Sequence, residues 1–188
     1  DVRMPDHPAD IGCCPIDLAG IDAVDVLHRP VQRDSMAAII PDDALGLAQL
    51  VRNKEVSAME LLELAIARSE AVNPQINYLV EELYTFAREA VSAGLPQGPF
   101  TGVPFLLKDL GMALKGTVTT NGSRFYRDAR SDYTSTVVQR YQQAGLVIFG
   151  KTASPEFGGT GTTESILFGD TRNPWDLSRS TGGSSGGS

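Results

Sequence analysis

The side chains whose types and spacing could do chemistry together are a lysine that follows an apolar run and two serines in a glycine-rich segment. Lys108 directly follows Val-Pro-Phe-Leu-Leu at residues 103–107, and Ser184 and Ser185 lie inside Gly-Gly-Ser-Ser-Gly-Gly-Ser at residues 182–188. A lysine acts as a base only when it is neutral, and desolvation among apolar neighbours lowers its pKa from the reference value of about 10.4. A neutral lysine beside a serine hydroxyl could take up a proton and return it, which is general acid–base chemistry in support of a nucleophile.

Histidine and cysteine chemistry is excluded for most of the chain. The histidines are His7 and His28, and the cysteines are the neighbours Cys13 and Cys14. A Ser-His-Asp triad, a Cys-His pair or a histidine-ligated zinc site therefore cannot be assembled from the residues after 28. We expect no metal and no cofactor. The base of a hydrolase built from this chain must be a lysine or a carboxylate.

Composition excludes further classes of protein. The net charge is −7, which argues against a nucleic-acid partner because neutralising phosphates requires clustered Lys and Arg. No apolar run approaches the roughly 20 residues that span a bilayer, and the N-terminus lacks a basic segment followed by an apolar one. We expect no membrane partner and, by default, a cytoplasmic location.

The elements that must position these side chains alternate between helices and strands. Ser57 and Glu60 form a predicted capping box, with Val56 and Leu61 placed as a hydrophobic staple. Apolar spacing predicts a helix from this box to about Asn73. The other predicted helices cover residues 43–51, residues 83–93, and a segment that begins at Ser131 or Asp132 and ends at Gly145.

Strands are predicted at residues 76–80, 103–107 and 146–149, and the last two read as buried on both faces. The sequence therefore predicts an α/β fold, a mixed β-sheet flanked by helices. Lys108 would lie at a buried strand end. Because side chains alternate along a strand, Asp109 should point away from Lys108. Beyond Gly150 the Gly-, Ser- and Thr-rich sequence is typical of an ordered active-site loop.

One motif points elsewhere. Residues 145–152, Gly-Leu-Val-Ile-Phe-Gly-Lys-Thr, satisfy the nucleotide-binding pattern G-x-x-x-x-G-K-[ST] letter for letter. A phosphate loop needs a strand before the first glycine and a helix that begins at the lysine. Here a predicted helix precedes Gly145, the middle residues are a strand, and Pro155 follows where a helix should continue. A nucleotide binder with Lys151 at its site stays the less favoured alternative.

Three segments in order carry a family resemblance: residues 102–110 (Gly-Val-Pro-Phe-Leu-Leu-Lys-Asp-Leu), residues 150–157 (Gly-Lys-Thr-Ala-Ser-Pro-Glu-Phe) and residues 171–188. Residues 182–188 alone read as a flexible linker, but the turn at residues 173–176 with its Trp175 anchor is not linker sequence. Together, over about residues 36–188, they resemble the amidase signature family of amide hydrolases. Within that family the sequence is also similar to hydrolases of linear and cyclic 6-aminohexanoate amides.

The resemblance implies a role for each site residue. Lys108 matches the catalytic lysine, and Ser184 matches the bridging serine that relays the proton at an unusual cis peptide. Gly182 and Gly183 allow the backbone its unusual course, and Ser185 supports the loop by hydrogen bonding. The implied partner is a small-molecule amide substrate, and a homodimer stays open.

Other polar residues near these segments are left out of the predicted site. The resemblance assigns Glu156 to loop structure rather than to catalysis. Arg172, Asn173 and Trp175 are interpreted as packing and loop-fixing residues, because a single tryptophan is more often core than ligand contact.

In the family, the acylated serine and the oxyanion hole lie about two dozen residues after the bridging serine, whereas four residues follow Ser184. We therefore expect residues 36–188 to be the N-terminal part of an amidase domain, with an incomplete fold and no activity alone. The strands at 103–107 and 146–149 should then expose apolar faces and unpaired edges, and solubility should be poor. Residues 1–35 read as a disordered leader or tail. The alternative is a non-catalytic binding or assembly protein.

Overall fold

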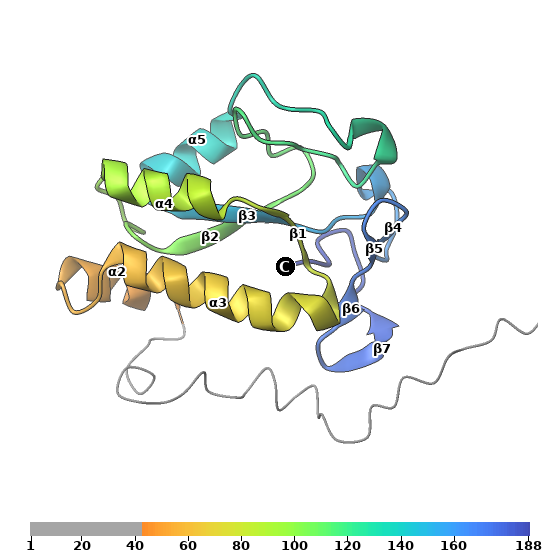
Figure 1. Ribbon diagram of the computed structural model, residues 1–188, viewed down its shortest axis with the longest axis horizontal. Helices are drawn as coiled ribbons and strands as arrows, with labels where there is room; N and C mark the ends of the chain where they lie inside the picture. The colour runs from red at the N-terminus through yellow and green to blue at the C-terminus, as the bar shows by residue number, and fades with distance from the viewer. Residues whose placement is uncertain (1–42) are drawn as a thin grey trace, which may run out of the picture.

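A three-stranded mixed sheet lies at the centre of residues 43–188, the part of the chain that this computed structural model describes (Figure 1). Its strands are β1 (Leu79–Glu82), β2 (Pro104–Lys108) and β3 (Val147–Thr152), in the order β1-β3-β2. β3 runs antiparallel to β1 and parallel to β2. The predicted mixed α/β sheet is confirmed, whereas the tail predicted at residues 1–35 lies outside the described residues.

Within residues 43–188, four helices pack around this sheet: α2 (Ala44–Arg52), α3 (Ala58–Ile76), α4 (Tyr84–Ala93) and α5 (Thr136–Gln143). The capping box predicted at the start of α3 is confirmed. Asp43 accepts a hydrogen bond from the Gly46 amide, and Ser57 and Glu60 form the complete capping box. Such caps satisfy amides that lack partners within the helix.

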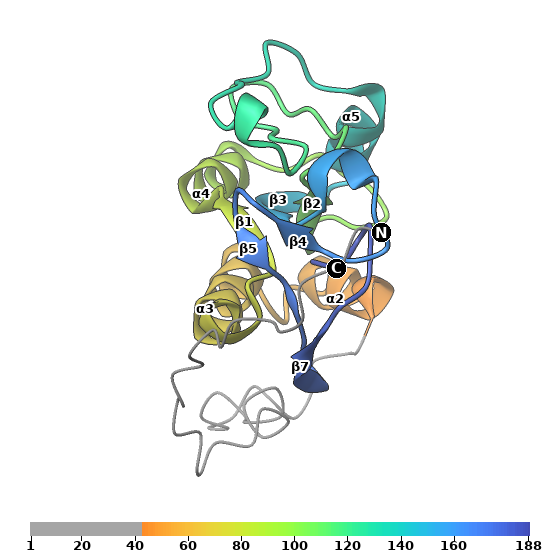
Figure 2. The same cartoon turned by 90° about the vertical axis from the view of Figure 1, so that its right-hand side faces the viewer.

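Apolar side chains from both faces of β3 join the helices to the sheet. On one face Val147 and Phe149 pack with Leu62 and Ile66 of α3 and with Ala87 of α4. On the other face Ile148 packs with Leu107 of β2 and Val138 of α5. Figures 1 and 2 agree that α2 and α3 lie on one side of the sheet and α5 on the other. The two clusters form the core that holds the strand ends in place.

The two strands predicted as buried differ. Every residue of β3 is buried, as expected for a central strand, so the expectation that it would expose an apolar face is wrong. In β2 only Leu107 is buried, and Pro104, Phe105 and Leu106 are half-buried. The prediction of burial on both faces is wrong for β2 because it is an edge strand in the described region and borders a groove of about 980 Å³.

Two boundaries near β1 also differ from prediction. Helix α3 continues through Pro74 to Ile76, because a proline in the last turn removes only one hydrogen bond. Asn77 then ends the helix in a left-handed conformation, and its amide donates to the Asn73 carbonyl over 2.8 Å. The Asn73 side chain accepts the amides of Tyr78 and Leu79. The strand predicted from residue 76 therefore begins only at Leu79.

The helix predicted from Ser131 or Asp132 begins later, at Thr136, with Ser135 as its N-cap. Residues 130–131 are used instead in an extended pairing. The Ser131 amide donates to the Thr117 carbonyl over 2.9 Å, and the Gly116 amide donates to the Ser131 carbonyl over 2.8 Å. This pairing is a contact between distant segments, which local capping signals do not reveal.

After β3 the chain forms short elements rather than long ones. They are the 3-10 turn η2 (Glu156–Gly158), the hairpin β4 (Glu164–Ser165) with β5 (Gly169–Asp170), and the hairpin β6 (Arg172–Asn173) with β7 (Asp176–Ser180). An earlier 3-10 turn, η1, covers Arg124–Tyr126. Glu156 is exposed. This region is the ordered loop that the sequence predicts.

Side chains of the second hairpin confirm one interpretation and correct another. Arg172 donates to the Leu177 carbonyl, and Asn173 accepts the Trp175 amide, so both fix the loop as predicted. Trp175 itself is 71% exposed and borders the groove beside β2 rather than filling a core. The prediction that Trp175 is a packing residue is wrong. It was based on residue type alone, and the position of Trp175 at a hairpin turn leaves its ring at the surface.

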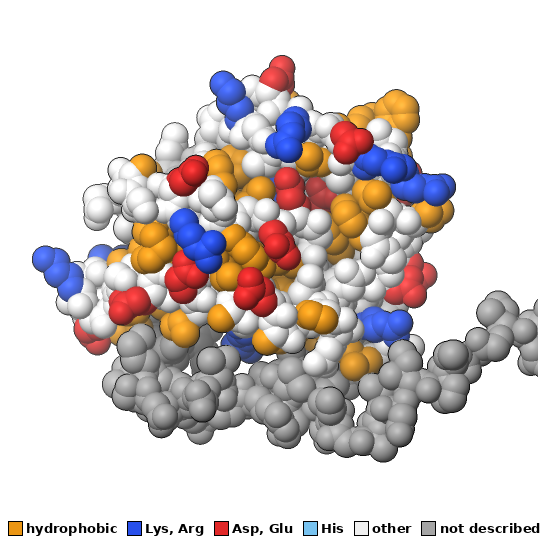
Figure 3. Space-filling model, in the orientation of Figure 1, with side chains coloured by type: hydrophobic (Ala, Val, Ile, Leu, Met, Phe, Trp, Pro, Cys, Tyr) orange, Lys and Arg blue, Asp and Glu red, His pale blue; other side chains and the backbone are white. Residues whose placement is uncertain are grey.

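Charges of both signs lie on the face drawn in Figure 3, where Lys and Arg side chains are found among Asp and Glu side chains. Within residues 43–188, no helix combines the length and the apolar character that a bilayer crossing needs.

Candidate active site

The structure brings together the two residues predicted to do chemistry. Lys108 ends β2, and Ser184 lies 76 positions later in the C-terminal loop. The Lys108 Nζ donates a hydrogen bond to the Ser184 Oγ over 2.8 Å. This distance is direct contact, so a proton can pass between the two groups without a bridging water.

Lys108 is half-buried, and this burial affects its protonation. Desolvation lowers the pKa of Lys108 from its ordinary value because removing water penalises the charged form. The neighbouring carboxylate does not oppose the effect. Asp109 is 1% exposed and accepts hydrogen bonds from the Thr120 amide and hydroxyl. The prediction that Asp109 points away from Lys108 is therefore confirmed.

The loop that carries Ser184 has the backbone that the resemblance implies. The peptide bond between Gly183 and Ser184 is cis, and Gly182 has φ +79°. A Cβ atom at position 183 would lie 2.9 Å from the Thr162 carbonyl oxygen, so glycine allows the close approach. Ser185 is exposed, and its carbonyl accepts the Ser188 amide over 3.1 Å. This hydrogen bond of Ser185 lies within the loop and is made by its backbone.

Sequence reasoning missed the residues that hold this loop in place. Thr163 is fully buried, and its hydroxyl donates to the Gly182 carbonyl over 2.7 Å. The Gly187 amide donates to the Ala153 carbonyl over 3.2 Å. Gly158 lies beneath the serine, because a Cβ atom there would come within 3.5 Å of the Ser184 Oγ. The only sequence signal for these contacts is the Gly- and Thr-rich composition of residues 158–163.

The nucleotide-binding alternative does not match the structure. Gly145 follows helix α5, and Lys151 lies inside β3 with 0% of its surface exposed. The Lys151 Nζ donates to the Val118 carbonyl and the Thr119 hydroxyl and lies 3.3 Å from the Glu81 carboxylate. Because its ammonium group is enclosed by protein groups, Lys151 cannot reach a phosphate.

The site can therefore store and transfer a proton between a lysine and a serine hydroxyl. Among residues 43–188, no three His, Cys, Asp or Glu side chains are grouped so that they could hold a metal ion. The chemistry that this geometry supports is proton transfer to and from a reacting group that is brought to Ser184.

Comparison with known proteins assigns this chain to a family. Residues 60–188 match the family model described as Amidase. The chain belongs to the amidase signature family. Lys108, Ser184 and the cis peptide of this amidase chain all lie inside the matched residues.

Two relatives and one solved structure illustrate the amidase match. The 6-aminohexanoate-cyclic-dimer hydrolase of Paenarthrobacter ureafaciens is 47% identical over 148 residues, which are 78% of this chain and 30% of the relative. The lipoamidase of Enterococcus faecalis is 43% identical over 148 residues, 77% of this chain and 20% of the relative. A solved structure of 6-aminohexanoate cyclic dimer hydrolase complexed with substrate superposes with a TM-score of 0.74 at 46% identity, covering 78% of this chain and 30% of that one.

The amidase chain thus spans 30% of the length of the first of these relatives. The superposition confirms the partial amidase fold, with its small mixed sheet and flanking helices.

Proposed function

We propose that these residues are part of an amidase that hydrolyses the C–N bond of a carboxylic acid amide through a Ser-cisSer-Lys relay. The observation that carries the proposal is the 2.8 Å contact between the Lys108 Nζ and the Ser184 Oγ, at a cis peptide, in a member of the amidase signature family. Lys108 is the base and Ser184 the bridging residue. Gly182, Gly183 and Ser185 support the loop.

The proton path has two directions. As a nucleophilic serine attacks the amide carbonyl, its proton passes to the Ser184 Oγ while the Ser184 proton passes to the neutral Lys108. When the tetrahedral intermediate collapses and the C–N bond breaks, the proton returns through Ser184 to the leaving amine. A water molecule then attacks the acyl-enzyme, and the same relay takes its proton and returns it to the serine.

The lowered pKa of Lys108 supports this role. A lysine with its ordinary pKa of about 10.4 would be almost entirely protonated at neutral pH and could not accept a proton. Half-burial of Lys108 at the end of β2 lowers the pKa by desolvation. The neutral fraction at a given pH therefore increases, which is what a general base requires.

The nucleophile and the oxyanion donors are proposed to lie outside residues 1–188. Removal of an essential nucleophile leaves little of an enzyme's rate, so the 188-residue chain should not hydrolyse amides by itself. The proposed substrate is a small-molecule amide. Cyclic and linear 6-aminohexanoate amides are the first candidates, because a hydrolase named for the cyclic dimer is 47% identical over the matched region.

The test is hydrolysis by the full-length protein, followed as release of the amine from the 6-aminohexanoate cyclic dimer and from a panel of simple acyl amides. We expect Lys108→Met to lose between about 10²- and 10⁴-fold in kcat, the usual range for general acid–base catalysis. Lys115→Met is the matched control, because Lys115 is exposed and seven positions away in the sequence. Hydrolysis that persists unchanged in Lys108→Met would exclude this mechanism.

A further inference from the structure

A second polar cluster lies on the opposite face of the sheet from Lys108 and Ser184, and the mechanism above does not use it. In the parallel pairing of β2 with β3, Lys108 is opposite Thr152 and Leu107 is opposite Lys151. Because successive side chains of a strand point to opposite faces, Lys108 and Lys151 lie on different sides of the sheet. Leu107 also belongs to the core cluster on the α5 side.

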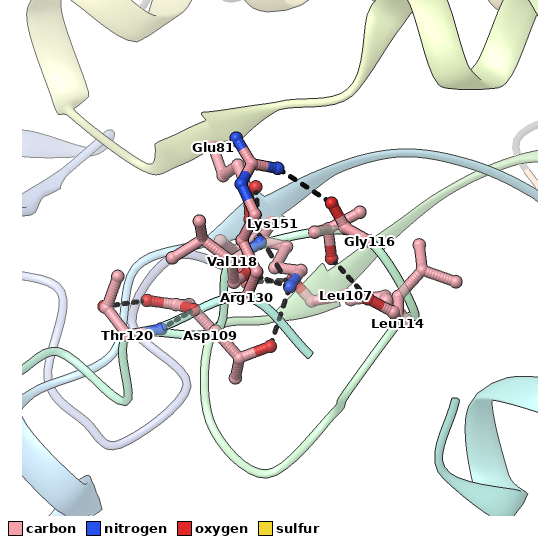
Figure 4. Close-up of polar contacts among 12 residues, drawn as sticks. Glu81, Leu107, Asp109, Leu114, Gly116, Val118, Thr120, Arg130 and Lys151 are labelled. Carbon is pink, nitrogen blue, oxygen red and sulfur yellow. Dashed lines mark hydrogen bonds and ion pairs between the residues drawn. The ribbon is translucent and has the colours of Figure 1, made fainter. Parts of the chain in front are cut away.

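Lys151 binds the segment of residues 118–121 to two strands. Its Nζ donates to the Val118 carbonyl and, over 2.8 Å, to the Thr119 hydroxyl. It also pairs with Glu81 of β1 at 3.3 Å, and the Glu81 carboxylate accepts the Val118 amide over 3.0 Å. Figure 4 shows Lys151, Glu81 and Val118 converging at this point. Residue 118 is therefore held by both its amide and its carbonyl.

Asp109 binds the same segment to the end of β2. Its carboxylate accepts the Thr120 amide over 2.8 Å and the Thr120 hydroxyl (Figure 4). Its own amide donates to the Thr152 carbonyl over 2.9 Å, and its carbonyl accepts the Ser154 hydroxyl over 3.2 Å. All the polar groups of Asp109 are thus engaged, and they fix the backbone directly after Lys108.

The same segment also reaches the serine. Asn121 accepts the Gly111 amide with its side chain over 3.1 Å and the Phe157 amide with its carbonyl over 2.8 Å. Gly158 follows Phe157 and lies against the Ser184 Oγ. Residues 118–121 therefore connect the backbone after Lys108 with the turn beneath Ser184.

We infer that Asp109 and Lys151 are positioning residues for the Lys108–Ser184 pair, because they hold residues 118–121 against the sheet and that segment fixes both partners. The inference rests on the proposed function in that Lys108 is taken as the base. Neither residue touches the reacting atoms. They act by fixing the position of the Lys108 side chain and by keeping the pKa of Lys108 low, so that its amine can be neutral.

Charge adds a second reason for this arrangement. Burial raises the pKa of Asp109, while the hydrogen bonds from Thr120 and the charge of Lys151 lower it and the charge of Glu81 raises it. The hydrogen bonds direct the Asp109 carboxylate toward Thr120. Were it released, it could turn toward the adjacent Lys108, and a carboxylate within about 4–6 Å favours the protonated form of a lysine.

The test measures the apparent pKa of Lys108 in the full-length protein by competitive acetylation across a pH series, with the Lys108 peptide quantified by mass spectrometry. Thr120→Val removes the hydroxyl partner of Asp109 while keeping the shape of the side chain, and Thr120→Ser keeps the hydroxyl. Lys151→Met/Glu81→Gln is a second variant that removes the buried lysine charge together with its partly exposed carboxylate partner. Far-UV circular dichroism checks that each variant is folded.

In the wild type and in Thr120→Ser we expect Lys108 to titrate below the lysine reference of about 10.4. In Thr120→Val and in the double variant the apparent pKa should rise by about one unit. A Lys108 titration unchanged in either folded variant would overturn the inference. If the full-length protein hydrolyses no amide, the proposed function fails, but the labelling still decides the positioning role. If amide hydrolysis depends on Lys108 but the apparent pKa of Lys108 is the same in Thr120→Val as in the wild type, only the positioning role fails.

Discussion

Lys108 and Lys151 occupy neighbouring strands of one sheet, yet their environments are opposite. Lys108 is half-buried at the end of an edge strand and has one hydrogen bond, to the Ser184 hydroxyl. Lys151 is fully buried in the central strand, where it binds a carbonyl and a hydroxyl and pairs with the Glu81 carboxylate. One lysine has a neutral partner and the other has an anionic one.

The difference shows how a protein assigns two roles to one residue type. Desolvation lowers the pKa of both lysines, but for Lys151 the charges of Glu81 and Asp109 oppose the decrease. For Lys151 desolvation outweighs the paired charges, so its pKa also lies below the ordinary value. Access separates the two lysines, because Lys108 is half-buried and contacts the Ser184 hydroxyl, whereas Lys151 is enclosed by its partners. Lys108 is therefore suited to chemistry and Lys151 to structure.

The largest expected effect comes from removing each lysine in turn. Lys151→Met should lower the free energy of unfolding by about 3–5 kcal/mol, because Glu81 is left without its cation. Lys108→Met should cause no comparable loss, because no charged partner is left unpaired and the cost of desolvating the lysine is removed. Chemical denaturation of both variants measures the difference. Equal losses in the two variants would remove the distinction between the lysines.

The activity of the full-length protein should depend on pH through Lys108 alone. Because the pKa of Lys108 is lowered, kcat/KM should rise as pH rises through that pKa and fall about tenfold per unit below it. Lys108→Arg should be inactive at every pH, since a guanidinium stays protonated. A rate that is flat across the acid range would contradict the assignment of Lys108 as the base.

Folding stability should follow pH in the same direction. Between the lowered folded pKa of Lys108 and the unfolded value near 10.4, the unfolded chain binds more protons, so the free energy of unfolding increases with pH. Lys108→Met should lose this part of the pH dependence. Denaturation midpoints of the two proteins across that window provide the check, and parallel curves would count against a lowered Lys108 pKa.

A smaller effect is expected from a substitution at Gly158, in the turn next to Ser184. Gly158 has φ +67°, and a Cβ atom there would lie 2.7 Å from the Leu110 side chain. Gly158→Ala should cost about 1–2 kcal/mol from the left-handed backbone alone and should also shift the turn beneath Ser184. Gly111→Ala is the matched control, since Gly111 has φ +68° with nothing near the added Cβ. Activity should fall more in Gly158→Ala than in Gly111→Ala, and equal activity would argue against a role for the turn.

The smallest effect is expected at an exposed ion pair. Arg88 and Glu63 form a hydrogen-bonded pair at 2.6 Å with both side chains nearly half exposed. Glu63→Gln should change the free energy of unfolding only slightly, because solvent screens such pairs. The loss of stability in Glu63→Gln is the reference for the loss in Lys151→Met. If the two losses were equal, burial would not explain the difference between an exposed and a buried ion pair.

Local signals in the sequence predicted several elements correctly. The capping box at Ser57 and Glu60 fixed the start of α3, and the apolar run before Gly150 identified the central strand. Local signals failed where a distant segment decides the structure. The start of α5 depends on the pairing of Ser131 with Thr117, and the boundary between α3 and β1 depends on the side chain of Asn73.

The candidate site divides in the same way. The Lys108 and Ser184 positions follow from residue order and family resemblance, and the structure places them in contact. The residues that hold them, Thr163 and the network of Lys151 and Asp109, give no local signal because each acts through a partner far away in the sequence. Lys151 is also part of a sequence that matches a nucleotide-binding motif, and its burial inside β3 shows that it has a structural role instead.

The most direct test of the account is the titration of the Lys108 side chain by NMR in the folded protein, with the signal assigned by its absence in Lys108→Met. The account predicts that the Lys108 amine titrates below the ordinary lysine value of about 10.4, and that Ser184→Ala leaves its pKa lowered because desolvation is the cause. A Lys108 amine that titrates at or above the ordinary value would contradict the claim that this lysine is the base of the relay.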